Sequence, residues 1–249
     1  MADPELVVVP VDGPAGAVFT TRIGGVSIGP NAQMNLGAHV ADDPDSVRAN
    51  RGALCARLGI DPARVQLGSQ VHGVHIGAAI DPLPESAFLA PDSAWPDRDG
   101  IWSQTPGVAV GVFGADCLPV LLWRRDRPKV AAVHVGWKGL IGGILEAAVA
   151  ILDAPGRTGV AIGPGIGPCC YEVGDELQDQ FSRRFGDHVI AGRAVNLAAA
   201  AQSALRTVGI PEDAIWALET CTSCDVHRWF SYRRDGAPTG RQMGLIWPV

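Results

Sequence analysis

Basic charge, long apolar runs and low-complexity tracts are all scarce in this sequence. Its 249 residues carry 20 lysines and arginines against 26 aspartates and glutamates, a formal net charge of −6. Residues 124–129 hold the densest basic group, and we expect it at the tip of a hairpin. Without a basic face, the chain has no electrostatic footprint for DNA or RNA. We therefore expect no nucleic-acid partner.

Apolar runs stay far below the roughly 20 residues that a membrane helix needs. The opening "MADPELVVVPVDGPAG" also lacks the basic start of a secretory signal, so we expect a cytoplasmic protein with no membrane partner. Its six cysteines are then expected to be reduced thiols. A hydrophobic content of 47% with 18% charged residues is typical of a soluble enzyme, and the length fits one domain over residues 1–249.

Strand patterns outnumber helix patterns along the chain. Strand-like apolar segments occur at residues 64–80, Val108–Phe113, Leu118–Trp123, Val130–Val135, 159–167, 214–219, 229–236 and 240–249. Helix patterns occur at residues 42–60, 139–153, the second half of 168–186, and 196–209, with Asp45 or a neighbour and Asn196 as N-caps. The Pro- and Asp-rich residues 79–100 are expected to form a long surface loop. Several strands look hairpin-linked, which favours an α+β or mixed α/β fold over a regular doubly wound one.

The segment "GADCLPVLLWRRDRPKVAAVHVGWKGL", residues 114–140, joins two apolar strand patterns through a charged turn. Cys117 directly precedes the first strand, and His134 lies near the end of the second, where ligands and catalytic groups gather in mixed sheets. Packing, a metal site and a thiol nucleophile are three interpretations of this pair. The Gly-rich turn that follows holds Lys138 near a helix N-terminus, a position suited to an anion.

A third residue of metal-binding type, His72, stands in "QVHGVHI" three positions before His75. In a strand these two histidines would point to opposite faces, so only one of them would face a given pocket. His72, Cys117 and His134 would together make a three-ligand zinc site with one position open for water. Their wide separation in sequence does not distinguish this site from ordinary packing.

Cys221 and Cys224 form a CxxC pair, which invites a zinc-ribbon or redox interpretation. A zinc ribbon requires a second such pair, and the adjacent Cys169 and Cys170 lack that spacing. A thioredoxin-like role requires a βα unit that the pattern does not show. We therefore expect these cysteines to act as small apolar side chains.

Taken together, the motifs resemble those of the YfiH family, also called the laccase-domain, polyphenol oxidase-like or purine nucleoside phosphorylase family. They are "FTTRIGGVSIGPNAQMNLGAHVADDPDSVRANR", "QVHG", "ADCLPVLL", "HVGWKGL", "IGPCCYEVG" and "FSYRRDGAPTGRQMGLI", in order from about Phe19 to Ile246. The family usually has "HAGWRG" in place of "HVGWKG", and Lys138 cannot reproduce a bidentate Arg clamp. The resemblance implies a sheet-core sandwich covered by helices, like the cysteine hydrolases related to cytotoxic necrotising factor.

The resemblance also implies a zinc ion held by His72, Cys117 and His134. The family activities are phosphorolysis of adenosine, inosine and methylthioadenosine with inorganic phosphate, together with adenosine deamination. Zinc-bound water would attack C6 of adenine, with a carboxylate moving the proton, and Asp116 is the carboxylate nearest in sequence.

Phosphorolysis requires an anion pocket and contacts to base and sugar. We expect Arg22 and Lys138 to hold phosphate, and Asn35 or His39 to hydrogen-bond base or sugar. For Arg22 and Asn35 the alternative role is stabilisation of the surrounding turns.

Two other activities remain as alternatives. In a Cys/His amidohydrolase acting on peptidoglycan precursors, Cys117 would be the nucleophile and His134 the base. A copper-dependent polyphenol oxidase would require many more histidines, arranged in HxH pairs. This chain has six histidines and no HxH pair. A closed four-ligand zinc site would indicate a binding module instead of an enzyme.

Overall fold

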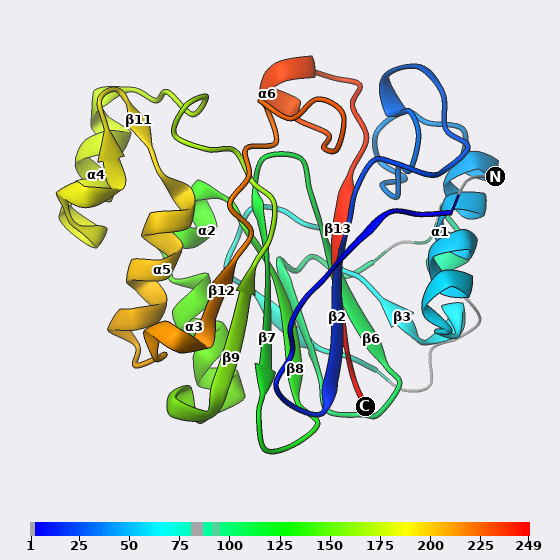
Figure 1. Cartoon of the computed structure of the whole chain (residues 1–249), viewed down its shortest axis with the longest axis horizontal. Helices are drawn as coiled ribbons and strands as arrows, with labels where there is room; N and C mark the ends of the chain where they lie inside the picture. The colour runs from blue at the N-terminus through cyan, green and yellow to red at the C-terminus, as the bar shows by residue number, and fades with distance from the viewer. Residues whose placement is uncertain (1–2, 81–86, 92, 94) are drawn as a thin grey trace.

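Two β-sheets pack face to face at the centre of the computed structural model, and helices cover the outer face of each (Figure 1). The structure describes residues 3–80, 87–91, 93 and 95–249. Part of the expected loop at 79–100 therefore lies outside the described residues. The arrangement confirms the mixed α/β fold with a sheet core covered by helices.

The five-stranded sheet has the order β1–β2–β13–β6–β3, and all of its pairs are antiparallel except β3 with β6. Its strands are β1 (Leu6–Val8), β2 (Ala15–Thr20), β3 (Val65–Gln66), β6 (Ala109–Gly114) and β13 (Gln242–Pro248).

The six-stranded sheet has the order β12–β9–β7–β8–β5–β4, with parallel pairs only at its two edges. Its strands are β4 (Ile76–Ala78), β5 (Gly100–Ser103), β7 (Leu118–Arg124), β8 (Val130–Val135), β9 (Thr158–Ile162) and β12 (Ile215–Ala217). A separate short hairpin pairs β10 (Ile190–Ala191) with β11 (Ala194–Val195).

Strand β7 shows how the two cores divide its side chains. Leu118, Val120 and Leu122 face the helix-covered side, whereas Leu121 and Trp123 pack between the two sheets. Successive side chains of a strand point to opposite faces, so a strand covered on both faces must be apolar throughout. All seven residues of β7 are buried, which explains the unbroken apolar run from Leu118 to Trp123.

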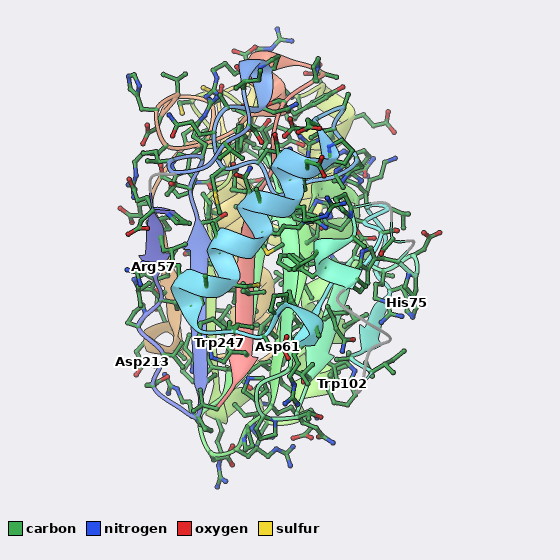
Figure 2. The ribbon with its side chains drawn as sticks, turned by 90° about the vertical axis from the view of Figure 1, so that its right-hand side faces the viewer. Arg57, Asp61, His75, Trp102, Asp213 and Trp247 are labelled. Carbon is green, nitrogen blue, oxygen red and sulfur yellow. The ribbon has the colours of Figure 1, made fainter. Side chains whose placement is uncertain are left out.

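Helices α2 (Trp137–Gly142), α3 (Ile144–Leu152), α4 (Asp175–Phe185) and α5 (Leu197–Thr207) lie on the side of the six-stranded sheet. Helix α1 (Pro44–Leu58) lies across the five-stranded sheet (Figure 2). The Asp43 carboxylate caps α1 by accepting the Ser46 amide at 2.9 Å, and Asn196 caps α5 as expected. In the described part of the chain, every helix is too short or too polar to cross a membrane.

Three expected elements differ from the structure. The helix expected at residues 139–153 is two helices, because Gly143 with φ 92° ends α2 in a left-handed conformation. The strand expected at 229–236 is wrong, since the Ser231 hydroxyl caps the short helix α6 (Tyr232–Asp235) through the Arg234 amide. Most of the strand expected at 64–80 is a loop between β3 and β4.

Candidate functional site

The hairpin of β7 and β8 brings Cys117 and His134 to one end of the six-stranded sheet. Pro119 of β7 pairs with His134 of β8, and Cys117 lies in the turn immediately before β7. Helix α6 covers this end of the two sheets (Figure 1). The hairpin expected from the sequence is confirmed, and it places the thiol and the imidazole side by side.

Asp99 fixes both histidines of the site. Its fully buried carboxylate accepts a hydrogen bond from Nδ1 of His134 at 2.8 Å. It also accepts the amides of Val71, His72 and Gly73 at 3.2, 2.8 and 2.6 Å. His72 has a φ of 61°, a conformation that costs free energy for a residue other than glycine, and these amide bonds hold it in place.

One ligand atom from each of His72, Cys117 and His134 lies within 4.8 Å of the other two. The two imidazole rings are 4.8 Å apart at centroids and nearly perpendicular, at 81°. Because Nδ1 of His134 is bound to Asp99, its Nε2 is directed to the site. His75 instead lies at the edge of the molecule (Figure 2), with its Nδ1 3.0 Å from the Asp97 carbonyl oxygen, so only His72 of that pair belongs to the group.

Burial and mutual hydrogen bonds shift the pKa values of Cys117, His134 and Asp99. Burial would raise the pKa of Cys117, but hydrogen bonds with His134 and His72 bring it down to about 6. Burial would lower the pKa of His134, but hydrogen bonds with Asp99 and Cys117 raise it to about 9. Burial would also raise the pKa of Asp99, yet bonds from His134 and the Gly73 and His72 amides bring it below its usual value. Near neutral pH the metal-free site therefore holds a thiolate beside an imidazolium.

A cavity of about 380 Å³ opens onto this group, a volume in the range of small-molecule sites. Gly136 lies against the converging residues, since a Cβ there would lie 3.1 Å from both Cys117 Sγ and His72 Cδ2. The lining of the cavity combines the three converging residues with aromatic rings, arginines and backbone: His39, Gln70, His72, Phe113, Gly114, Ala115, Asp116, Cys117, His134, Ile166, Tyr171, Tyr232, Arg233 and Arg241.

Asp116 lies on the cavity wall beside Cys117, with a φ of 100°. One carboxylate oxygen accepts the Thr222 hydroxyl at 2.6 Å, and the other accepts the Arg233 amide at 2.6 Å. Its carbonyl accepts the Ile166 amide at 2.9 Å. Asp116 therefore links the loops that carry Thr222 and Ile166 to helix α6 at the rim of the cavity.

Of the residues expected to bind substrate, His39 lines this cavity, whereas Arg22, Asn35 and Lys138 lie outside its lining. The guanidinium of Arg22 donates to the Ala32 carbonyl at 2.9 and 2.6 Å and stacks on Phe230. Asn35 is fully buried and bonds the backbone of Gly37. Lys138 is exposed on α2, with its ammonium 5.5 Å from the Trp137 ring centre.

A second group of donors lies close to the cavity. The sulfurs of Cys169, Cys170, Cys221 and Cys224 all lie within 4.8 Å of one another, so they could hold a metal ion. The expectation that these cysteines serve only as small apolar side chains did not anticipate this convergence. The CxxC pair was the available signal. Its partners Cys170 and Cys169 lie 54 and 55 residues before Cys224 in the chain.

Asp99 is the residue of the site that sequence reasoning missed. It directly precedes β5, whose Gly100 pairs with Val133 of β8. That register places Asp99 opposite His134, whose amide donates to the Asp99 carbonyl at 2.7 Å. Predicting the antiparallel pairing of β5 with β8 from the sequence would have placed Asp99 beside His134.

Comparison with known proteins shows the family of this chain. Residues 16–248 match a family model described as "Multi-copper polyphenol oxidoreductase laccase". A "purine nucleoside phosphorylase" of Pseudomonas aeruginosa is 40% identical over 93% of this chain and 92% of its own. "Purine nucleoside phosphorylase YfiH" of Escherichia coli is 36% identical, covering 94% and 93%.

Solved structures give the same result. The "hypothetical protein YfiH" of Bacillus licheniformis superposes with a TM-score of 0.91 at 29% identity, covering 99% of this chain and 97% of that one. YlmD of Geobacillus stearothermophilus superposes with a TM-score of 0.89 at 33% identity, covering 96% and 94%. The chain therefore belongs to the laccase-domain family, also called the YfiH family.

Proposed function

We propose that this chain is a purine nucleoside phosphorylase whose active site is the cavity around His72, Cys117 and His134. The observation that carries the proposal is a cavity lined by a converging His₂Cys group, in a chain 36–40% identical to relatives of that name over 92–93% of their length. The pocket combines arginines for an anion with aromatic rings for a base.

Zinc fits the donor set of this site. Two imidazoles and one thiolate are ligands that zinc prefers, and Asp99 orients His134 in the way that carboxylates commonly orient zinc-bound histidines. His72, Cys117 and His134 all line the cavity, and as three protein ligands they would leave a fourth position open for water or substrate. A bound zinc would supply a Lewis acid that lowers the pKa of a water molecule to about 7.

In phosphorolysis, a phosphate oxygen forms a bond to C1′ of the ribose while the bond from C1′ to N9 breaks and the purine takes up a proton. We assign the phosphate to Arg233 and Arg241, because both line the cavity. Burial lowers the pKa of Arg241, which marks a partly desolvated cation that an anion would stabilise. Lys138 lies outside the cavity lining, on a helix of only six residues.

Deamination of adenosine is a second reaction of the same pocket under this proposal. A water oxygen bonds to C6, and the amino group leaves as ammonia after it gains a proton. Asp116 lies on the wall with both carboxylate oxygens already hydrogen-bonded. Each of these oxygens has a second lone pair, so Asp116 could take up a proton without losing its bond from Thr222.

The test is to incubate zinc-replete protein with adenosine and inorganic phosphate. We expect adenine and ribose 1-phosphate as the main products, with inosine as a second product. Arg241→Met is expected to raise the KM for phosphate, whereas the matched loss of charge in Lys138→Ala leaves it unchanged. Folded, zinc-replete protein that forms no adenine would refute the proposal, and an effect of Lys138→Ala alone would return the phosphate to α2.

A cysteine amidohydrolase is the second candidate, and one observation favours it. Asp99, His134 and Cys117 form a connected carboxylate–imidazole–thiol series, the arrangement that activates a sulfur nucleophile. Metal content separates the two proposals. One stoichiometric zinc that blocks alkylation of Cys117 contradicts the amidohydrolase, whereas metal-free purified protein with a reactive Cys117 supports it.

Phenol oxidation by several coppers receives little support from the arrangement of histidines. Of the six histidines, the converging group contains His72 and His134, and His39 lies on the cavity wall. Multi-copper sites need far more imidazole ligands than this. We therefore do not propose the oxidase activity that the family description names.

A further inference from the structure

Four cysteines from two distant segments form a compact group beside the cavity. The Sγ atom of Cys224 lies 3.4 Å from those of Cys169 and Cys170, and all four sulfurs lie within 4.8 Å. A disulfide bond is about 2.05 Å long, so these are separate thiols. Crowded thiolates repel one another unless a cation lies between them.

The loop between β9 and α4 is shaped around these sulfurs. The amide of Gly167 donates to the Cys221 sulfur at 3.2 Å. A Cβ at Gly167 would lie 3.2 Å from Cys221 Cβ and 3.4 Å from Cys169 Sγ. The glycine therefore lets the backbone approach the sulfurs closely, and its N–H stabilises one of them as a thiolate, as outer hydrogen bonds do at metal sites.

The spacing suits a single tetrahedral ion. With zinc–sulfur bonds of about 2.3 Å, the sulfurs of a regular tetrahedron are about 3.8 Å apart. Four sulfurs within 4.8 Å need only small rotations to reach that geometry. A cluster of two or more irons would hold its cysteine sulfurs further apart, because different metal atoms separate them.

We propose that Cys169, Cys170, Cys221 and Cys224 bind a structural zinc ion distinct from the His72–Cys117–His134 site. All four positions of this ion are filled by protein, so the site has no open position for a substrate. The proposal does not depend on the proposed function, because it concerns a different set of ligands.

The ion would fasten the loop that carries Ile166 and Tyr171 of the cavity wall to the loop at 221–225. Thr222, next to Cys221, donates its amide to the Gly165 carbonyl at 2.9 Å and its hydroxyl to Asp116. The guanidinium of Arg233 donates to the Cys170 carbonyl at 3.3 Å and stacks on Tyr171. A metal crosslink at this point therefore supports the residues that line the cavity without touching a substrate.

The test is metal analysis of reductively purified protein, together with two variants. We expect two zinc ions per chain in the wild type, one in Cys224→Ser and one in Cys117→Ser. X-ray absorption of Cys117→Ser, which keeps only the proposed site, should show four sulfur neighbours at about 2.3 Å. Cys224→Ser is also expected to unfold at a lower temperature than Cys117→Ser.

Several results would overturn the proposal. One is a wild-type protein that holds a single zinc ion, which Cys117→Ser removes completely. A second is a Cys117→Ser protein whose zinc has nitrogen neighbours, and a third is iron in place of zinc. If Cys224→Ser fails to fold, the zinc content and sulfur neighbours of Cys117→Ser still decide the question. Thiol titration in denaturant is the control for oxidation, since all six cysteines are free thiols in the structure.

Discussion

Replacing Asp99 by asparagine removes a single charge at the point where the site is held together. The carboxylate accepts four N–H groups, those of Val71 and Gly73 at Oδ2 and those of His72 and His134 at Oδ1. Whichever way the asparagine amide is turned, its NH₂ group faces two of these donors. Hydrogen bonds to charged groups contribute about 1.5–3 kcal/mol each, so losing two lowers the free energy of unfolding by about 3–6 kcal/mol.

The same change should loosen zinc, because Asp99 orients one proposed ligand and holds the backbone of another. Outer partners of metal ligands typically contribute roughly 10- to 100-fold in metal affinity. Urea unfolding of the metal-free protein measures the first effect, and competition with a chelating dye measures the second. Asp97→Asn is the matched control, since this aspartate is exposed two residues away. Asp99→Asn protein with unchanged stability and zinc affinity would refute the reasoning.

Other outcomes test the surroundings of the thiol. In metal-free protein, Cys117 should react with iodoacetamide at half its maximal rate near pH 6, more slowly below that pH and no faster well above it, because only the thiolate reacts. Peptide mass spectrometry measures this, and Cys55, whose pKa burial raises to about 12, should stay unmodified at neutral pH. Gly136→Ala should lose metal while staying folded, because its Cβ would meet the Cys117 sulfur at 3.1 Å. Gly52→Ala, within α1 where a Cβ meets nothing within 4 Å, should keep its metal and raise the free energy of unfolding by about 0.5–1 kcal/mol. Cys117 alkylation that begins only near pH 9, or full metal content in Gly136→Ala, would contradict the geometry.

The parts of the fold that the sequence predicts are those governed by local patterns. Leu118–Trp123 and Val130–Val135 are apolar, equal in length and separated by a short charged turn, so antiparallel pairing of neighbours is the simplest outcome. The structure agrees with their limits to within one residue. The α5 cap at Asn196 was predictable for the same reason, because the side chain bonds an amide three residues away.

The parts that were not predictable depend on distant contacts. Residues 229–236 have the aromatic content of a strand, yet Arg234 bonds the Trp229 carbonyl at 3.0 Å and the Thr222 carbonyl at 2.8 Å, which holds the segment in a tight turn. Asp99 becomes part of the site only through the register of β5 with β8. The four-cysteine group needs the loops at 165–171 and 221–225 to meet, and no spacing rule for adjacent cysteines anticipates that.

If both proposed sites bind a metal ion, the position of Asp116 would link them thermodynamically. Its backbone leads directly into Cys117, and its carboxylate is bonded to Thr222, the neighbour of Cys221. An ion that orders this loop from one side lowers the entropy cost of ordering it from the other. The coupling is reciprocal. If metal at the four-cysteine group raises the metal affinity of the histidine site by some factor, metal at the histidine site raises the affinity of the four-cysteine group by the same factor. Oxidation of exposed Cys169 or Cys224 that releases this metal would therefore lower the metal affinity of the histidine site in the cavity, although the oxidised atom lies at a distance from it.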